Sequence, residues 1–570
     1  MAKTLPKVDI VTVGVGWVGG IIAAELTKKG YKVVGIERGR ERSTSDYFFG
    51  HDELRYSERY ELMTDISKDT VSIRHNMKQR ALPMREWGSF LIGDGVGGSA
   101  NHWSGSVTRF LPYDFEIYSQ TVDRYGKAKI PQDMTVQDWG ITYEELEKYY
   151  QMWEATSGIS GEENPHPGLP KFKWPTKPMM MTPIMELFKK AALDLKMHPY
   201  ISGSANLSEI YTNPDGMTIN ACQYCGFCER FGCEYGAKSD PTITVVPVAK
   251  KTGNYEIRTH SVVRRVLHKD GKATGVSYIN TLTGEEFIQP AEVVVLSAWT
   301  FGNVKILLNS KLGRPYDPTT GQGVIGKNYT YQSTAGKSTA FFDQQFNLYA
   351  GTGALAMAAD DFNGDLFDHS ELNFIHGGQI KLSAKGDLPI KTNNVPDGTP
   401  GWGREFKEKS LEYTNKSIAI GASASCMPNR YNYLDLDPTY RDAYGDPILR
   451  MTFNWTDQDR NLVKFLGEKT AAVAKQMGAK EVKQGGKLKD YDSTSYQSTH
   501  NVGGAIMGAD PETSALNNYL QMWDCENVFV PGANAFPHNS ATNPTGTVAA
   551  LAYRAAEGIE KYLKTGGPLV

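Results

Sequence analysis

Four of the six cysteines fall in one short run. Cys222, Cys225, Cys228 and Cys233 are spaced C-x2-C-x2-C-x4-C, whereas the remaining two cysteines stand alone. A disulfide framework spreads its cysteines along the chain. Structural zinc usually takes two cysteine pairs from separated knuckles, while bacterial ferredoxins ligate iron with the similar run C-x2-C-x2-C-x3-C. The spacing therefore favours an iron–sulfur cluster over zinc or disulfides.

A glycine motif near the N-terminus has the spacing of a dinucleotide site. The pattern G-x-G-x-x-G lies between two apolar runs, at residues 10–13 and 33–36, that are typical of buried parallel strands. Glycines permit a tight turn close to a pyrophosphate at a helix N-terminus, and an acidic residue about twenty positions on binds the ribose. The residues that this pattern assigns to the cofactor are Gly14, Gly16, Gly19 and Glu37.

Length and charge narrow the class of protein. A chain of 570 residues is too long for one nucleotide-binding module, so a second region must cover the cofactor and shape a substrate pocket. The net charge of -3 gives no reason to expect nucleic acid as a partner. No apolar run approaches the roughly 20 residues that span a bilayer. Because the N-terminus runs directly into a strand, we expect no signal peptide, and this feature alone predicts the cytoplasm.

The remaining pattern predicts an α/β chain. Residues 255–279 read as two strands around a turn, and residues 291–296 as another buried strand. Residues 340–420 are rich in Gly, Asp, Asn and Pro with little periodicity, which predicts long loops over a sheet. The segments that show helical spacing or helix-start signals are 143–157, 183–197, 304–309, 457–476 and 547–563.

Taken in order, these motifs resemble the glucose–methanol–choline (GMC) oxidoreductases, which bind FAD. The sequence GVGGSANHWSG resembles their second glycine motif, and residues 500–504 (HNVGG) and 543–546 (NPTG) resemble their paired catalytic motifs. Within the family the likeness is to the flavoprotein subunits of bacterial membrane-associated gluconate 2-dehydrogenases. It rests on the cysteine run, on YLDLDPTYRDAYGDPILRMTF and on NPTGTVAALAY. Further FAD contacts implied by the resemblance are Gly97, Gly98, Asn101, His102, Val262, Ala298, Ala533, Asn534 and Thr545.

The resemblance implies that His500 and Asn543 are catalytic. An alcohol gives up a hydride only if its hydroxyl proton also leaves, and a neutral imidazole is a suitable acceptor. The usual second catalytic histidine of the family is replaced by Asn543, so we expect His500 to be the sole base. His538 is a rival base that we expect in the pocket wall. We expect His102 to contact the flavin, and a covalent bond to the flavin 8α-methyl carbon stays open.

The predicted fold is a Rossmann-like FAD-binding domain from residues 1–110, 200–330 and 495–570. A substrate domain with a mixed β-sheet would come from residues 111–199 and 331–494. The expected activity is FAD-dependent oxidation of a secondary hydroxyl on a sugar or sugar acid, with gluconate to 2-ketogluconate as the first candidate.

Alternatives are a glucoside 3-dehydrogenase, a polyol, fructose or glucose dehydrogenase, an oxygen-using pyranose oxidase, and a non-enzymatic electron-transfer subunit.

The resemblance also implies further cofactors and partners. It predicts a 3Fe–4S or 4Fe–4S cluster, and in a three-iron cluster one of the four cysteines would not be a ligand. The expected partners are a small subunit that carries an export signal and an electron acceptor, either a cytochrome c subunit or a quinone. This places the expected complex at the periplasmic face of the inner membrane, which overrides the cytoplasmic prediction.

Overall fold

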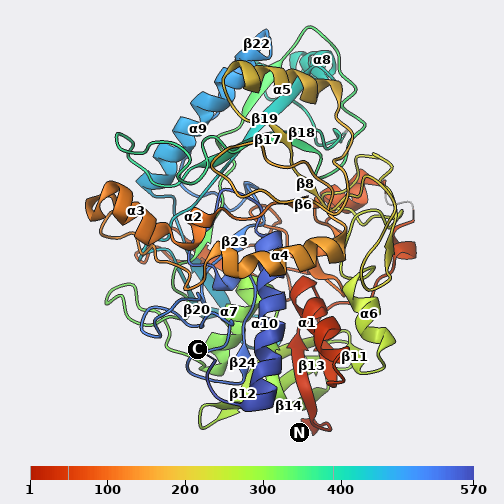
Figure 1. Ribbon diagram of the computed structural model, residues 1–570, viewed down its shortest axis with the longest axis vertical. Coiled ribbons are helices and arrows are strands. Elements are labelled where there is room, and N and C mark those ends of the chain that lie inside the picture. The colour runs from red at the N-terminus through yellow and green to blue at the C-terminus, as the bar shows by residue number, and fades with distance from the viewer. Residues whose placement is uncertain (1, 49–50, 389, 570) are drawn as a thin grey trace.

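Two sheets, one in each lobe, lie on either side of the middle of the molecule (Figure 1). The structure is a computed structural model that describes residues 2–48, 51–388 and 390–569. The lower lobe contains both chain termini and the glycine motif. The upper lobe is built mainly from the second half of the chain.

The lower sheet has eight strands and contains the predicted nucleotide-binding unit. Its parallel part runs in the order β11-β3-β2-β14, and an antiparallel meander continues it through β13 and β12. The long strand β14 belongs to both parts, since its second half also pairs with β24. The bounds are β1 (Lys3–Thr4), β2 (Val8–Val13), β3 (Val33–Ile36), β11 (Tyr255–Arg258), β12 (Ser261–Lys269), β13 (Lys272–Asn280), β14 (Glu286–Leu296) and β24 (Val528–Phe529).

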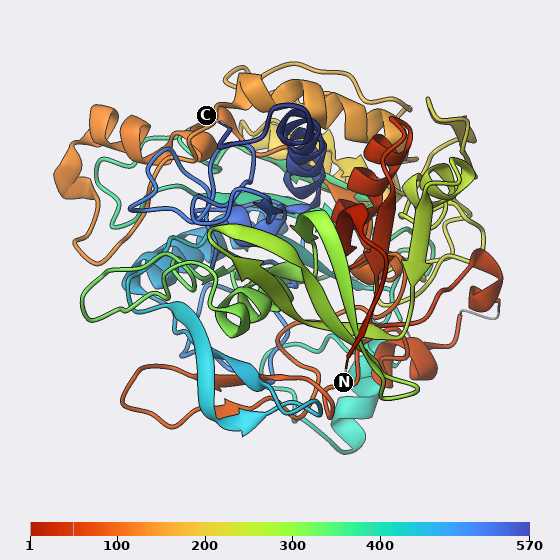
Figure 2. The same ribbon diagram turned by 90° about the horizontal axis from the view of Figure 1, so that it is seen from below.

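Three helices stack beside this sheet. The helix α1 (Trp17–Thr27) packs against α10 (Thr545–Thr565), which packs in turn against α4 (Tyr143–Ser157). Figure 2 shows α1 in red and α10 in dark blue next to the green strands of the meander. Thr142 begins α4 with a capping box, because its side chain accepts from the Glu145 amide and Glu145 bonds back. These helices cover one face of the sheet, and the successive buried residues of β2 and β14 show that its central strands are covered on both faces.

The upper sheet has six strands in the order β22-β16-β19-β18-β17-β7, and every pairing is antiparallel. Its outer face packs on α9 (Asp457–Gln476) and α5 (Pro183–Asp194) through a core that includes Ile380, Ile420 and Val473. The bounds are β7 (Tyr200–Ile201), β16 (Ser338–Phe341), β17 (Ala356–Ala359), β18 (Gly378–Ser383), β19 (Ser417–Ala424) and β22 (Glu481–Lys483).

Long loops make up most of residues 340–420, as expected, but regular elements lie between them. This segment supplies β17, β18, half of β19 and the helix α8 (Arg404–Tyr413). These strands are short and separated by loops, and their inner positions are small or polar residues such as Ser383, Gly421 and Ser423, so each gives only a brief alternation of apolar and polar residues. The same small residues face the interior cavity described below.

A third, four-stranded sheet is mixed and runs β20-β21-β4-β5. Its bounds are β4 (Val71–Arg74), β5 (Leu82–Pro83), β20 (Tyr433–Arg441) and β21 (Pro447–Thr452). The predicted fold class is confirmed. This sheet, however, joins strands that we assigned to different domains, and the proposed domain borders stay a prediction.

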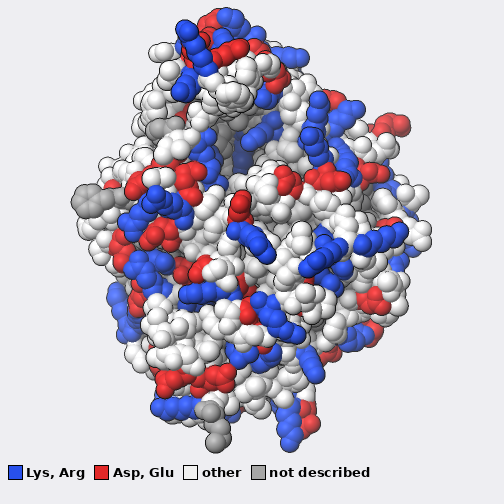
Figure 3. Space-filling model, turned by 180° about the vertical axis from the view of Figure 1, so that it is seen from behind, with Lys and Arg blue, Asp and Glu red and all other residues white. Residues whose placement is uncertain are grey.

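Charges are dispersed over the surface seen in Figure 3. Basic and acidic side chains are interspersed on this face, which is hollowed beneath the upper lobe, and basic side chains lie around the hollow. Within the described residues, no helix combines the length and apolar character that crossing a bilayer requires.

Candidate active site

A cavity of about 1050 Å³ lies between the lower and upper sheets. Its floor comes from the glycine segments and from the carboxyl ends of the parallel strands, where nucleotide ligands bind in open α/β sheets. Its roof comes from the inner face of the upper sheet. Most of the predicted site residues line it: Gly14, Gly16, Glu37, Gly97, Gly98, His102, Val262, Ala298, His500, Ala533, Asn543 and Thr545.

Three predicted FAD contacts do not line the cavity but support the loops that do. A Cβ on Gly19 would lie 2.1 Å from the Gly14 carbonyl oxygen, so Gly19 permits the close turn before α1. Asn101 donates to the Val96 carbonyl at 2.7 Å and holds the second glycine loop. Asn534 donates to the Val530 carbonyl at 2.9 Å and accepts from Asn303 at 2.8 Å.

The nucleotide end of the cavity fits FAD. Gly14 has a φ of 96°, and a Cβ there would meet the Ser297 carbonyl oxygen at 2.6 Å. At Gly16 the nearest atom to a Cβ is 3.8 Å away, so backbone is open to a ligand at the N-terminus of α1. Glu37 accepts from the Val15 and Gly39 amides, both at 3.0 Å, and its burial raises its pKa. These contacts hold the carboxylate at the site where the resemblance puts the adenosine ribose.

His102 lies between the cavity and the cysteine run. Its Nε2 atom is buried with no hydrogen-bond partner among the described residues. Burial, and then the nearby charge of Lys238, lowers its pKa to about 3, so the ring is neutral. An orphaned ring nitrogen on the cavity wall fits a flavin contact, and the covalent bond stays a prediction.

His500 and Asn543 meet inside the cavity. His500 Nε2 lies 3.2 Å from Asn543 Nδ2, which can only donate a hydrogen bond. Asn543 Oδ1 in turn accepts from the Ser106 hydroxyl at 3.0 Å. His500 Nε2 must therefore carry a lone pair rather than a proton.

Gln332 fixes the same tautomer from the other side of the ring. Its amide nitrogen donates to the carbonyls of Ser540 at 3.0 Å and Thr542 at 3.3 Å, so its oxygen must face the imidazole. That oxygen lies 2.7 Å from His500 Nδ1, which consequently carries the proton. Burial, and then the charge of Lys381, lowers the pKa of His500 to about 3. His500 is thus a neutral imidazole whose Nε2 lone pair faces the cavity and accepts from Asn543.

Sequence reasoning missed three residues that contact this pair: Ser106, Gln332 and Lys381. Lys381 Nζ lies 3.4 Å from Asn543 Oδ1. Each of the three is an isolated side chain on a strand or in the extended segment beside one, and none belongs to a motif. Only the three-dimensional pairing of distant segments brings them to His500.

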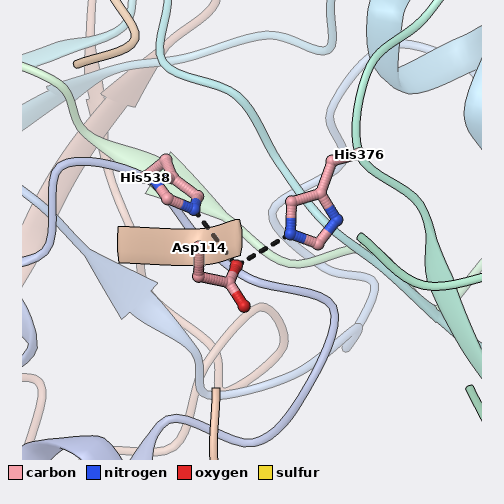
Figure 4. A group of neighbouring side chains, drawn as sticks. All are labelled: Asp114, His376 and His538. Carbon is pink, nitrogen blue, oxygen red and sulfur yellow. Dashed lines mark hydrogen bonds and ion pairs between the residues drawn. The ribbon is translucent and has the colours of Figure 1, made fainter. Parts of the chain in front are cut away.

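His538 belongs to a different, closed cluster. Its ring is fully buried, and Nε2 lies 3.2 Å from Asp114 Oδ1, which also accepts from His376 Nε2 at 2.8 Å (Figure 4). His538 does not line the cavity, so our expectation that it lies in the pocket wall is wrong. The ring is held too far inside the protein to meet a substrate.

The closed cluster has the residue types of a metal site but the wrong protonation. His376 Nδ1 accepts from the Gly377 amide at 2.7 Å, and His538 Nδ1 faces the indole N–H of Trp139 at 3.4 Å. Both rings must therefore carry their proton on Nε2, where a metal would need a lone pair. Hydrogen bonds and charge from the histidines oppose burial and hold the pKa of Asp114 below its usual range. The cluster is a satisfied buried network.

The cysteine run packs directly behind the His102 segment. The Arg230 amide donates to the His102 carbonyl at 2.7 Å. The fully buried Lys238 Nζ donates to the carbonyls of Trp103 at 2.9 Å and Cys228 at 3.0 Å. These bonds join the cysteine loop to the wall of the cavity.

The four cysteines line a space of about 10 Å³, and none forms a disulfide. Among the described residues, no three of their sulfur atoms lie within 4.8 Å of one another, whereas zinc at about 2.3 Å from each sulfur would hold them closer. The donor set fits an iron–sulfur cluster, for which the loop has to widen.

Two family models match the chain, both described as GMC oxidoreductase: one over residues 210–333 and the other over residues 428–552. The chain is 42% identical to a gluconate 2-dehydrogenase flavoprotein of Pantoea cypripedii, across 100% of this chain and 96% of that protein. The chain belongs to the GMC oxidoreductase family. It is therefore an FAD-dependent oxidoreductase that acts on CH–OH groups.

Other proteins also match over nearly their full length. The large subunit of fructose dehydrogenase from Gluconobacter japonicus is 24% identical, over 99% of this chain and 100% of that protein. A 2-methyl-1,2-propanediol dehydrogenase of Mycolicibacterium austroafricanum is 26% identical, over 98% of this chain and 96% of that protein. The crystal structure of pyridoxine 4-oxidase from Mesorbium loti has a TM-score of 0.62 at 15% identity, over 97% of this chain and 99% of that one, which shows the shared fold.

Proposed function

We propose that this GMC oxidoreductase oxidises a secondary hydroxyl of a sugar or sugar acid, with gluconate to 2-ketogluconate as the first candidate. The observation that carries the proposal is the unprotonated Nε2 of His500, which pairs with Asn543 in the same cavity as the FAD-binding glycines. The likeness to a gluconate 2-dehydrogenase flavoprotein supports the substrate class.

In the proposed reaction the chain's own residues bind the alcohol and remove its proton. The Asn543 amide holds the substrate oxygen next to His500, and His500 Nε2 accepts the hydroxyl proton as the C–H bond breaks. FAD, when bound, supplies a two-electron acceptor for the hydride. Gln332 holds His500 in the tautomer that can accept, and its oxygen stabilises the imidazolium that forms.

We also propose that Cys222, Cys225, Cys228 and Cys233 hold an iron–sulfur cluster of the 3Fe–4S or 4Fe–4S type. Such a cluster supplies one-electron chemistry, with its potential set by its surroundings. The Lys238 and Arg230 contacts that join the loop to the His102 segment support this role, because they keep the thiols close to the flavin side of the cavity.

The proposed partners follow from the same likeness. They are a small subunit that carries an export signal and an acceptor, either a cytochrome c subunit or a quinone, at the periplasmic face of the inner membrane. The related fructose dehydrogenase chain is named as a large subunit, which supports an assembly of several subunits.

Anaerobic flavin reduction tests the proposed activity. The FAD-loaded protein is mixed without oxygen with gluconate, glucose, glucosides, sorbitol or fructose, and the flavin absorbance is followed. We expect gluconate to bleach the flavin and to yield 2-ketogluconate. Rapid oxygen consumption during turnover would instead support the oxygen-using pyranose oxidase, and no bleaching by any sugar would contradict the proposal.

A double substitution tests the cluster. Cys225→Ser with Cys228→Ser should remove iron and sulfide and stop transfer to cytochrome c or quinone, while sugar-dependent flavin reduction continues. Cys525→Ser, outside the loop and buried elsewhere, is the matched control. Zinc without iron in the purified wild-type protein, or normal transfer by the double variant, would contradict the assignment.

A further inference from the structure

The roof of the cavity is made of small side chains with one long exception. On the inner face of the upper sheet, Ala356 of β17, Ser383 of β18 and Ala419 of β19 line the cavity. Lys381 lies on the same face of β18, because Ile380 and Leu382 point outward into the core against α9. The small residues leave room for a substrate, and the lysine is the charged group that reaches into this room from the middle of the sheet.

Lys381 has no anionic partner in the part of the chain that the structure describes. It is half-buried, and no carboxylate lies within 4.0 Å of its Nζ atom. By contrast, the neighbouring Lys385 pairs with Glu229 at 2.8 Å. Lys337, at the exposed rim of the cavity, also has no ion pair within the described residues. Burying a cation without an anionic partner costs free energy, and an anionic ligand would offset that cost.

Lys381 remains charged at neutral pH. Burial, and then the neighbouring Lys385, lowers its pKa to about 8, while Glu229 and Asp360 act in the opposite direction. The ammonium therefore predominates below pH 8. A carboxylate next to it would gain a charge-assisted hydrogen bond, which is stronger than a neutral one.

The position of Lys381 relative to His500 adds a geometric constraint. Its Nζ lies 3.4 Å from Asn543 Oδ1, and Asn543 Nδ2 lies 3.2 Å from His500 Nε2. One amide group thus separates the cation from the base. One substrate with oxygen-bearing groups on two neighbouring carbons can therefore contact the Lys381 ammonium and the His500 imidazole at the same time.

We propose that Lys381, assisted at the rim by Lys337, forms a carboxylate subsite that selects 2-hydroxy acids and directs oxidation to the carbon next to the carboxylate. The inference rests on the proposed function, since it names the substrate class of that same site. With the carboxylate on Lys381, the adjacent hydroxyl meets His500 Nε2.

A substrate pair tests the subsite on the holoenzyme. Gluconate and sorbitol differ at the first carbon, where a carboxylate is replaced by CH₂OH. For Lys381→Met, we expect the ratio of the flavin-reduction rate constant to Kd to fall about 10- to 100-fold further for gluconate than for sorbitol. Lys381→Arg, which keeps the charge, should restore much of the gluconate value. Lys464→Met, on α9 behind the same sheet, is the control and should match the wild type.

Equal losses for gluconate and sorbitol would overturn the proposal, because Lys381 would then act on the reaction rather than on a carboxylate. An unchanged gluconate value would also overturn it.

A binding measurement separates this inference from the proposed function. Acetate and acetamide are titrated into the FAD-loaded protein, and the flavin absorption spectrum is recorded. We expect acetate to perturb the wild-type spectrum saturably, acetamide to have little effect, and Lys381→Met to lose the acetate response. If no sugar bleaches the flavin but this pattern holds, the proposed activity fails and the subsite stands. Equal acetate binding by wild type and Lys381→Met, or none by either, would overturn the subsite.

Discussion

His500 and His538 come from neighbouring loops, yet their rings lie in opposite surroundings. His500 uses Nδ1 to donate to Gln332, and its Nε2, which accepts from Asn543, lies at the cavity. Both ring nitrogens of His538 have protein partners, Asp114 and Trp139, and its ring is fully buried (Figure 4). The same residue type is thus a base in one cluster and part of a structural network in the other. The deciding property is whether the acceptor nitrogen of the ring opens onto the cavity.

The two clusters are also physically joined. Asn539, next to His538, donates to the His500 carbonyl at 2.7 Å. Asp114, on the short helix α2 (Pro112–Phe115), therefore anchors a loop that supports the reactive histidine without contacting the cavity itself. Substitutions in the cavity cluster of His500, Asn543 and Gln332 should change the rate of the reaction. Substitutions in the closed cluster around Asp114 should change the stability of the fold.

Replacing His500 should have the largest effect. His500→Ala removes the proton acceptor, and we expect flavin reduction to slow by about 10²- to 10⁴-fold while FAD stays bound. Stopped-flow absorbance measures the rate, and His198→Ala, a half-buried histidine outside the cavity, is the control. A near wild-type rate in His500→Ala would refute its role as the base.

Replacing Asp114 should instead destabilise the fold. Asp114→Ala leaves the two histidine N–H groups and the Leu111 amide without their acceptor, and we expect a loss of about 3 kcal/mol in the free energy of unfolding. Denaturant titration measures this loss, with the exposed Asp343→Ala as the control. The flavin-reduction rate per bound flavin should change less than about threefold. A normal stability with a collapsed rate would reverse our assignment of the two clusters.

Gln332 should have an intermediate effect on the reaction. Gln332→Leu removes the acceptor that fixes the His500 tautomer, and we expect flavin reduction to slow by about 10-fold. Gln332→Glu keeps an acceptor and adds a negative charge, so it should raise the pKa of His500 and move the acid limb of the rate profile to higher pH. Rates and profiles that match the wild type in both variants would exclude a positioning role.

The lower lobe was predictable from sequence to a greater extent than the upper lobe. The glycine motif, the meander strands and the α4 and α10 helices depend on local spacing and capping, so a short window contains the signal. The inner strands of the upper sheet gave a weaker signal, because they are short and their cavity face holds small and polar residues such as Ser383 and Ser423.

The residues of the active site likewise differ in how far the sequence alone could predict them. Motifs identified His500 and Asn543, and the structure brings them within hydrogen-bonding distance. Gln332 and Lys381 are single residues on separate segments, and their relation to His500 exists only after those segments pair across the fold.

The pH dependence of flavin reduction at limiting substrate tests the central claim most directly, because it reports the protonation of the base in the free enzyme. Burial and Lys381 lower the pKa of His500 to about 3, and Lys381, with a pKa of about 8, stays protonated below neutrality. Protonation of Nε2 would abolish the base, so we expect the rate to change less than about twofold between pH 5 and 7 and to fall only in more acidic solution. A decline with a midpoint near 6.5, the ordinary value for histidine, would contradict the account.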